Sequence, residues 1–253
     1  MPAPVNMLKA QLLDGQLQKG LWMGLANGAV AEMAAHAGFD WCLIDAEHGP
    51  NDLITIQSQL QAMNGAPAAA VVRVPVAEDW MLKQVLDLGA QTVRIPMIDT
   101  AEQAARAGAA CKYPPHGVRG VGSALARASG YNAIPDYPTT ANDQVCVMVQ
   151  VESRAAIDNI DAIAGTDGVD VVFIGPADLS ADMGYLDQLD APEVEAAIAH
   201  AIARIRAAGK VAGIVLFNPR DFPRYIDKGV GFLGIGSDVT VLGGALRGLA
   251  QSV

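Results

Sequence analysis

The chain has 253 residues, of which 51% are hydrophobic and 17% charged, with a net charge of −10 and an isoelectric point near 4.7. This apolar fraction excludes a disordered chain and predicts extensive buried surface, part of it between subunits. The negative charge opposes binding to nucleic acids and anionic membranes, so neither partner is expected. An anionic substrate would need a local arginine or a metal ion.

The length is ordinary for one (β/α)8 barrel, so residues 1–253 are expected to form a single domain. Cys42, Cys111 and Cys146 lie in apolar or helical stretches without CxxC spacing, which is typical of reduced thiols. The amino terminus lacks the pattern of a signal peptide, and no apolar run reaches the roughly 18 residues of a membrane span. A cytoplasmic location is therefore predicted.

Apolar runs alternate with segments of helical periodicity along the chain. The eight predicted strands are LWMGLA (21–26), WCLID (41–45), AAAVVRVP (68–75), QTVRIPMID (91–99), VCVMVQV (145–151), VDVVFIG (169–175), KVAGIVLF (210–217) and FLGIGSD (232–238). After an opening helix at 6–17, the predicted helices are 29–37, a helix from a cap at Asn51 to residue 64, 78–88, 100–112, 153–165, 192–208, 221–228 and 240–250.

Eight strands that alternate with eight helices predict a closed parallel barrel, with a doubly wound open sheet as the alternative. No linker interrupts the series. The segment 113–143 is rich in proline and glycine and is too long for a simple connection, so we predict a lid or binding loop there. In either architecture, functional side chains are expected at the carboxyl ends of the strands.

Two carboxylates follow neighbouring strands. Glu152 comes directly after the run VCVMVQV, and Asp178 follows the run VDVVFIG. The helix between these runs makes the two strands parallel neighbours, so both side chains leave the same edge of the sheet. Because carboxylates are hard oxygen ligands, the pair can hold a divalent cation.

Other polar side chains follow strands that end at the same edge. They are Asp45, Glu47 and His48 after the second strand, Arg73 after the third, and Ser237 and Asp238 after the eighth. Each has a structural alternative: an acid can cap a helix, a histidine can pack, and an arginine can pair with an acid. Their coincidence with Glu152 and Asp178 favours an active site.

Other candidates are weaker. His36 and His200 fall within helices, and His116 belongs to the long loop. No GxGxxG motif follows the first strand, which argues against a dinucleotide site. The six lysines lie in helices, at helix ends or at the start of a strand, so none is placed to form a Schiff base at the carboxyl edge. If the barrel stabilises a carbanion, it must use a metal ion.

The motifs DAEHGPND, YPPHGVRGVGSALARAS, VQVES and FIGPADLSADMG resemble those of the HpcH/HpaI family of metal-dependent class II 2-keto-acid aldolases. The resemblance covers residues 21–249. It implies a (β/α)8 TIM barrel whose last helix is exchanged between subunits, in a homohexamer built from two trimers. It also implies Mg²⁺, Mn²⁺ or Co²⁺ bound to Glu152 and Asp178, and a role in the catabolism of aromatic compounds or sugar acids.

The resemblance further implies roles for individual residues. His48 matches the acid/base of the family, and Arg73 matches the group that stabilises the enolate. Asp87 matches an aspartate that reaches a histidine of a neighbouring subunit, although the sequence alone would make it a solvated helix charge.

Gln150, the backbone of Ala177 and Asp178 match substrate contacts. The implied reaction is reversible cleavage of a 4-hydroxy-2-oxo acid to an aldehyde and pyruvate or hydroxypyruvate, through an enolate that the metal stabilises. The alternatives are a related acyl-CoA lyase, for which no basic stretch suited to a nucleotide tail is present, and a non-catalytic barrel that binds keto acids.

Overall fold

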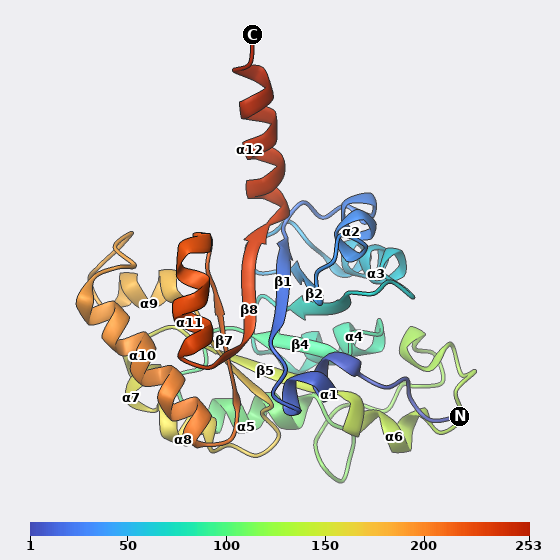
Figure 1. Ribbon diagram of the computed structural model, residues 1–253. Coiled ribbons are helices and arrows are strands. Elements are labelled where there is room, and N and C mark those ends of the chain that lie inside the picture. The colour runs from blue at the N-terminus through green and yellow to red at the C-terminus, as the bar shows by residue number, and fades with distance from the viewer.

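Eight parallel strands close into one barrel in the computed structural model, which describes residues 1–253 (Figure 1). Each strand pairs with the next in the sequence, and the eighth pairs with the first, so the predicted (β/α)8 fold is confirmed and the open sheet is excluded. The strands are β1 (Gln18–Met23), β2 (Trp41–Asp45), β3 (Ala69–Arg73), β4 (Thr92–Ile95), β5 (Cys146–Val151), β6 (Val171–Ile174), β7 (Val211–Val215) and β8 (Val230–Ser237).

The chain has twelve α-helices: ten lie in the connections between strands, one precedes the first strand and one follows the last. They are α1 (Met7–Leu13), α2 (Gly28–Ala35), α3 (Leu53–Ala62), α4 (Asp79–Asp87), α5 (Ala101–Ala110), α6 (Tyr137–Gln144), α7 (Arg154–Asp158), α8 (Ile160–Ala164), α9 (Pro176–Asp182), α10 (Pro192–Ala207), α11 (Phe222–Asp227) and α12 (Asp238–Ala250). Two short 3-10 helices, η1 (Arg127–Ser129) and η2 (Pro219–Asp221), complete the chain.

Several predicted boundaries were wrong for identifiable reasons. The cap of α3 is Asp52, whose side chain accepts the backbone N–H of Thr55 at 2.8 Å in a capping box. Asn51, the predicted cap, instead donates its side-chain N–H to the Asp45 carbonyl at 2.8 Å. The opening helix ends at Leu13, four residues early, because Gly15 adopts a φ of +79°.

Other differences concern the number and continuity of the helices. The predicted helix at 153–165 is two short helices, α7 and α8, separated at Asn159. The predicted irregular segment 113–143 contains η1 and most of α6, and the short helix α9 directly after β6 was not predicted. The first strand begins at Gln18, three residues before its predicted start, and the last helix begins at Asp238 rather than at residue 240.

The barrel has an outer and an inner core. The outer core packs the helices against the strands, and Val72, Val93 and Val149 from the strands are fully buried there. The inner core contains four aromatic side chains, Trp22, Trp41, Phe173 and Phe232. The rings of Trp41 and Phe232 stack with centroids 4.0 Å apart.

The helix α1 adds Leu8 and Leu12 to this inner core at the amino end of the strands (Figure 1). These side chains fill the interior toward the amino ends, and a cavity opens at the carboxyl ends.

The last helix projects away from the barrel instead of packing along it (Figure 1). Its apolar side chains are exposed, including Val241 at 64%, Leu246 at 57% and Leu249 at 71%. None of the twelve helices combines the length and the hydropathy that crossing a membrane requires. The three cysteines are unpaired and buried, as predicted for core thiols.

Candidate active site

A cavity of about 780 Å³ opens at the carboxyl ends of the strands. Side chains at or near the ends of seven strands line it, namely Trp22, Asp45, Arg73, Arg94, Gln150, Val215 and Ser237. Segments that follow strands contribute His48, Gly175, Ala177 and Asp178. The structure therefore gathers most of the predicted site residues around one space, because parallel strands end at one rim.

The two predicted metal ligands lie at the ends of adjacent strands. Val151 of β5 pairs with Ile174 of β6, which places Glu152 beside Gly175. The two residues approach so closely that a Cβ at position 175 would overlap Glu152 Oε2. Asp178 follows Gly175 by three residues, in the first turn of α9, and lines the cavity.

Glu152 is a buried carboxylate, 3% exposed, held by two donors. The backbone N–H of Met97 donates to Oε1 at 2.9 Å, and the side-chain amide of Gln150 donates to Oε2. Burial raises the pKa of Glu152, and the charge of Asp178 adds to that rise, whereas the two hydrogen bonds oppose it. Glu152 contacts Gln150 and Gly175, which line the cavity together with Asp178, so the two carboxylates lie in one region.

The charges at this end of the barrel suit a divalent cation. Four carboxylates, from Asp45, Glu47, Glu152 and Asp178, accompany the two arginines Arg73 and Arg94, so the ionised cluster retains two negative charges.

No set of three or more His, Cys, Asp or Glu side chains is close enough to hold an ion unaided. Mg²⁺ is commonly bound by one or two carboxylates, with water and substrate as the other ligands, so Glu152 and Asp178 fit that donor set.

Arg73 is held between two acids. Its Nε donates to Asp45 Oδ1 at 2.7 Å and its Nη2 to Oδ2 at 2.5 Å, while Nη1 lies 2.6 Å from Glu47 Oε2. Burial raises the pKa of Asp45, but the hydrogen bonds and charge of Arg73 outweigh it and the net pKa is lowered. Burial raises the pKa of Glu47 despite Arg73. The acids therefore fix the guanidinium orientation.

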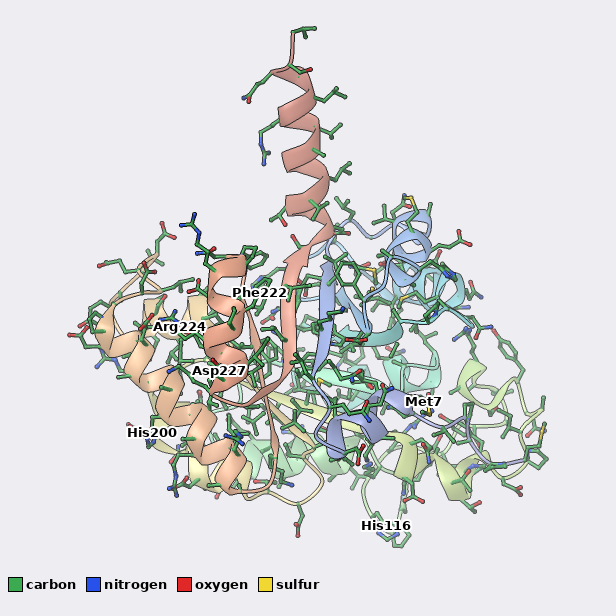
Figure 2. The ribbon with its side chains drawn as sticks, in the orientation of Figure 1. Met7, His116, His200, Phe222, Arg224 and Asp227 are labelled. Atoms are coloured by element: carbon green, nitrogen blue, oxygen red, sulfur yellow. The ribbon has the colours of Figure 1, made fainter.

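His48 lies at the rim of the cavity with its side chain 67% exposed. Its backbone N–H donates to Asp45 Oδ1 at 3.4 Å, and its side-chain Nε2 lies 4.0 Å from Glu47 Oε2. The other histidines lie elsewhere: Figure 2 shows His116 on the loop at the end of the barrel opposite α12, and His200 on the outer helix α10. His48 is therefore the one histidine that lines this cavity.

Arg94 was not predicted as a site residue, yet it lies at the bottom of the cavity and is 2% exposed. Its Nε and Nη2 donate to Oε1 of Gln150, and its Nη1 has no hydrogen-bond partner. The available sequence signal was a charged residue in the otherwise apolar strand TVRI. Burial lowers the pKa of Arg94 and Arg73 adds to the effect, whereas Glu152, Asp45 and Glu47 oppose it.

Four predicted residues do not line the cavity of their own chain. Glu47 and Glu152 contact Arg73 and Gln150, which do line it. The other two are Asp87 and Asp238.

Asp87 is the last residue of α4, so it lies toward the amino ends of the strands, where its Oδ1 accepts Arg119 Nη2 at 2.6 Å. Asp238 is buried and accepts the backbone N–H groups of Gly24 and Leu25 at 2.8 and 3.1 Å. Asp238 therefore fastens β8 to the end of β1 and does not line the cavity.

The fold and the site are those of a parallel-barrel enzyme. Two carboxylates follow adjacent strands and are available to bind a divalent ion. The family described as HpcH/HpaI aldolase/citrate lyase matches residues 18–245, and the chain belongs to this family.

Among its relatives, a hydroxypyruvate/pyruvate aldolase of Agrobacterium fabrum is 53% identical over 250 residues, covering 99% of this chain and 94% of the relative. A 4-hydroxy-2-oxo-heptane-1,7-dioate aldolase of Salmonella dublin is 52% identical over 245 residues, covering 97% and 93%. The crystal structure of an HpcH/HpaI aldolase/citrate lyase family protein from Burkholderia cenocepacia superposes with a TM-score of 0.94 at 40% identity, covering 98% of each chain.

The close approach of Gly175 to Glu152 predicts that Gly175→Ala weakens divalent metal binding. Gly175 has a φ of −91° and a ψ of 95°, which alanine adopts without strain, so the effect arises from the added Cβ displacing the carboxylate. We expect the Mn²⁺ dissociation constant, measured by isothermal titration calorimetry, to rise about tenfold or more.

Gly108→Ala in α5 is the matched control, because its new Cβ would meet no atom closer than 3.6 Å. Unchanged Mn²⁺ affinity in a folded Gly175→Ala protein would contradict the assignment of Glu152 as a ligand.

Proposed function

We propose that the protein is a divalent-metal-dependent aldolase that reversibly cleaves 4-hydroxy-2-oxo acids to an aldehyde and pyruvate or hydroxypyruvate. The observation that carries this proposal is a cavity lined by Asp178, His48 and Arg73, with the Glu152 carboxylate held beside it by Gln150, which also lines the cavity. The names of the relatives that are more than 50% identical along nearly the whole chain support the same reaction.

Glu152 and Asp178 are the residues that would hold the ion, for which Mg²⁺, Mn²⁺ and Co²⁺ are the candidates. When bound, such an ion supplies Lewis-acid polarisation of the substrate's 2-keto group, which favours cleavage of the C3–C4 bond. The buried position of Glu152 removes competing bulk water from one side of the site.

Gln150 and Ala177 are proposed to bind the carboxylate end of the keto acid. Both line the cavity beside Asp178. The backbone N–H of Ala177 belongs to the first turn of α9, where N–H groups have no acceptor within the helix. A substrate carboxylate supplies an acceptor for such a donor.

Arg73 is proposed to donate a hydrogen bond to the oxygen on which negative charge develops during cleavage. Because Asp45 and Glu47 already hold its guanidinium, little reorganisation is needed when the charge appears. His48 is proposed to take the proton of the C4 hydroxyl in cleavage and to return it in the reverse addition. Its exposed position at the rim allows exchange of that proton with solvent.

Imine chemistry is the competing route to a stabilised carbanion, and the cavity argues against it. None of the side chains that line the cavity is a lysine. Lys9 and Lys112 instead donate to the backbone carbonyl of Val145, next to the amino end of β5, at 2.9 and 3.1 Å.

We also propose that the working form is a homohexamer of two trimers in the cytoplasm. The exposed apolar side chains of α12 and the projection of this helix from its own barrel support packing against another subunit (Figure 1). In such an assembly, Asp87 is proposed to approach His48 of a neighbouring subunit, since it lies away from the cavity of its own chain.

Removal of the metal ion tests the proposed reaction. Exhaustive treatment with EDTA should abolish both cleavage of a 4-hydroxy-2-oxo acid and exchange of the pyruvate methyl protons with D₂O, because both need a polarised keto group. Addition of Mn²⁺, Mg²⁺ or Co²⁺ should restore them, as followed by NMR. Full cleavage activity after chelation, or a pyruvate adduct trapped with borohydride, would refute the proposal. Metal-dependent binding of pyruvate without proton exchange would indicate a non-catalytic barrel.

Replacement of His48 by alanine should lower kcat by roughly 10²–10⁴-fold, because a positioned acid/base contributes about that factor. KM should change little, since His48 makes no contact that holds Glu152 or Arg73 in place. His200→Ala on the outer face of α10 is the control and should leave kcat unchanged. If His48→Ala retained kcat within about threefold, another group would have to be the acid/base.

A further inference from the structure

Arg94 is a buried cation, 2% exposed, inside the barrel. It points into the interior of the barrel, with its guanidinium carbon 3.6 Å from the ring centroid of Phe173 and 4.6 Å from that of Trp22. It forms no direct ion pair, in contrast to Arg73, and its Nη1 lacks an acceptor. The cation–π contacts with these two rings offset part of the cost of burying the charge. They do not replace a paired acid, and they leave Nη1 without an acceptor, so stability alone does not account for an arginine at this position.

Arg94 is the donor in both of its side-chain hydrogen bonds. An arginine offers donors only, so the group of Gln150 that faces it must be the acceptor Oε1. Both Nε, at 2.5 Å, and Nη2 of Arg94 donate to this oxygen. With Oε1 fixed in this way, the Nε2 donor of Gln150 faces Glu152 and donates to Oε2. The Glu152 carboxylate is thus the final acceptor in the series from Arg94 through Gln150.

We propose that Arg94 is a positioning residue that fixes the orientation of the Gln150 amide and, through it, holds the Glu152 carboxylate in place for a divalent cation. The inference rests on the proposed metal-dependent function. It assigns Arg94 a role two hydrogen bonds away from the ion, and it distinguishes Arg94 from Arg73, which is held by Asp45 and Glu47.

The direction of these hydrogen bonds explains why the position of the Gln150 amide depends on Arg94. An amide can rotate to exchange its oxygen and nitrogen, and the two orientations occupy nearly the same space. Without Arg94, Oε1 of Gln150 would lose both of its donors, so the amide could move away from Glu152 and the hydrogen bond to Oε2 would be lost. The carboxylate would then move or lose its donor, and partners that orient metal ligands in this way typically affect affinity by 10–100-fold.

The test is a double-mutant cycle with Mn²⁺ affinity as its readout, measured by isothermal titration calorimetry on the full chain. Arg94→Met should weaken Mn²⁺ binding by about 10–100-fold. Arg106→Met is the matched control, because this arginine is 64% exposed and pairs with Asp79 on the surface. It should leave the affinity unchanged.

The second arm uses Gln150→Met. If Arg94 acts through Gln150, adding Arg94→Met to Gln150→Met should change the Mn²⁺ affinity by less than about twofold, because coupled residues are not additive. A packing role would instead give additive losses in the double variant. Additive losses, or wild-type affinity in Arg94→Met, would overturn the inference.

Two conservative variants keep the inference testable if Arg94→Met fails to fold. Arg94→Lys still offers only donors to Gln150 and should keep Mn²⁺ affinity within about fivefold. Arg94→Gln can present either an oxygen or a nitrogen, does not impose one orientation, and should bind Mn²⁺ more weakly than Arg94→Lys. Equal affinities of these two variants would contradict the inference. A wild-type protein that binds no divalent ion would instead overturn the proposed function itself.

Discussion

Burial of a carboxylate is the constraint around which this candidate site is built. Glu152 is buried at the end of β5, and this burial raises its pKa. Asp178, exposed in the first turn of α9, adds to the rise through its charge. Two donors, the Met97 backbone and the Gln150 side chain, offset part of this cost, and two arginines supply positive charge nearby. The remaining excess of negative charge is what a divalent cation would neutralise.

The barrel provides the rigidity that such an arrangement needs. Closure of β8 on β1 fixes each strand end relative to its neighbours, and the aromatic inner core fills the space beneath the cavity. Gly175 allows the end of β6 to approach Glu152 closely, and Asp238 fastens the end of β8 to the loop after β1. The rim is thereby held by close packing at Gly175 and by a buried carboxylate that accepts backbone N–H groups.

The topology and the rim could be predicted from the sequence because both follow from simple periodicity. A series of alternating strands and helices makes a parallel barrel, and the residues that follow strands must then meet at one end. Glu152, Asp178, His48 and Arg73 were found in this way. Asp87 was singled out only by its resemblance to the family.

What could not be predicted is where individual side chains point. In a strand buried on both faces, polar alternation does not distinguish the inside of a barrel from its outside, so Arg94 in TVRI carried no directional signal. Asp238 follows its strand as Asp178 does, yet it turns to two backbone N–H groups, which depends on the exact ending of β1.

Anomalous diffraction from a crystal soaked with Mn²⁺ and pyruvate tests the central claim most directly. We expect one strong anomalous peak in the cavity, with carboxylate oxygens of both Glu152 and Asp178 about 2 Å from it. A peak that contacts only one of these carboxylates, or that lies away from the carboxyl ends of β5 and β6, would contradict the account.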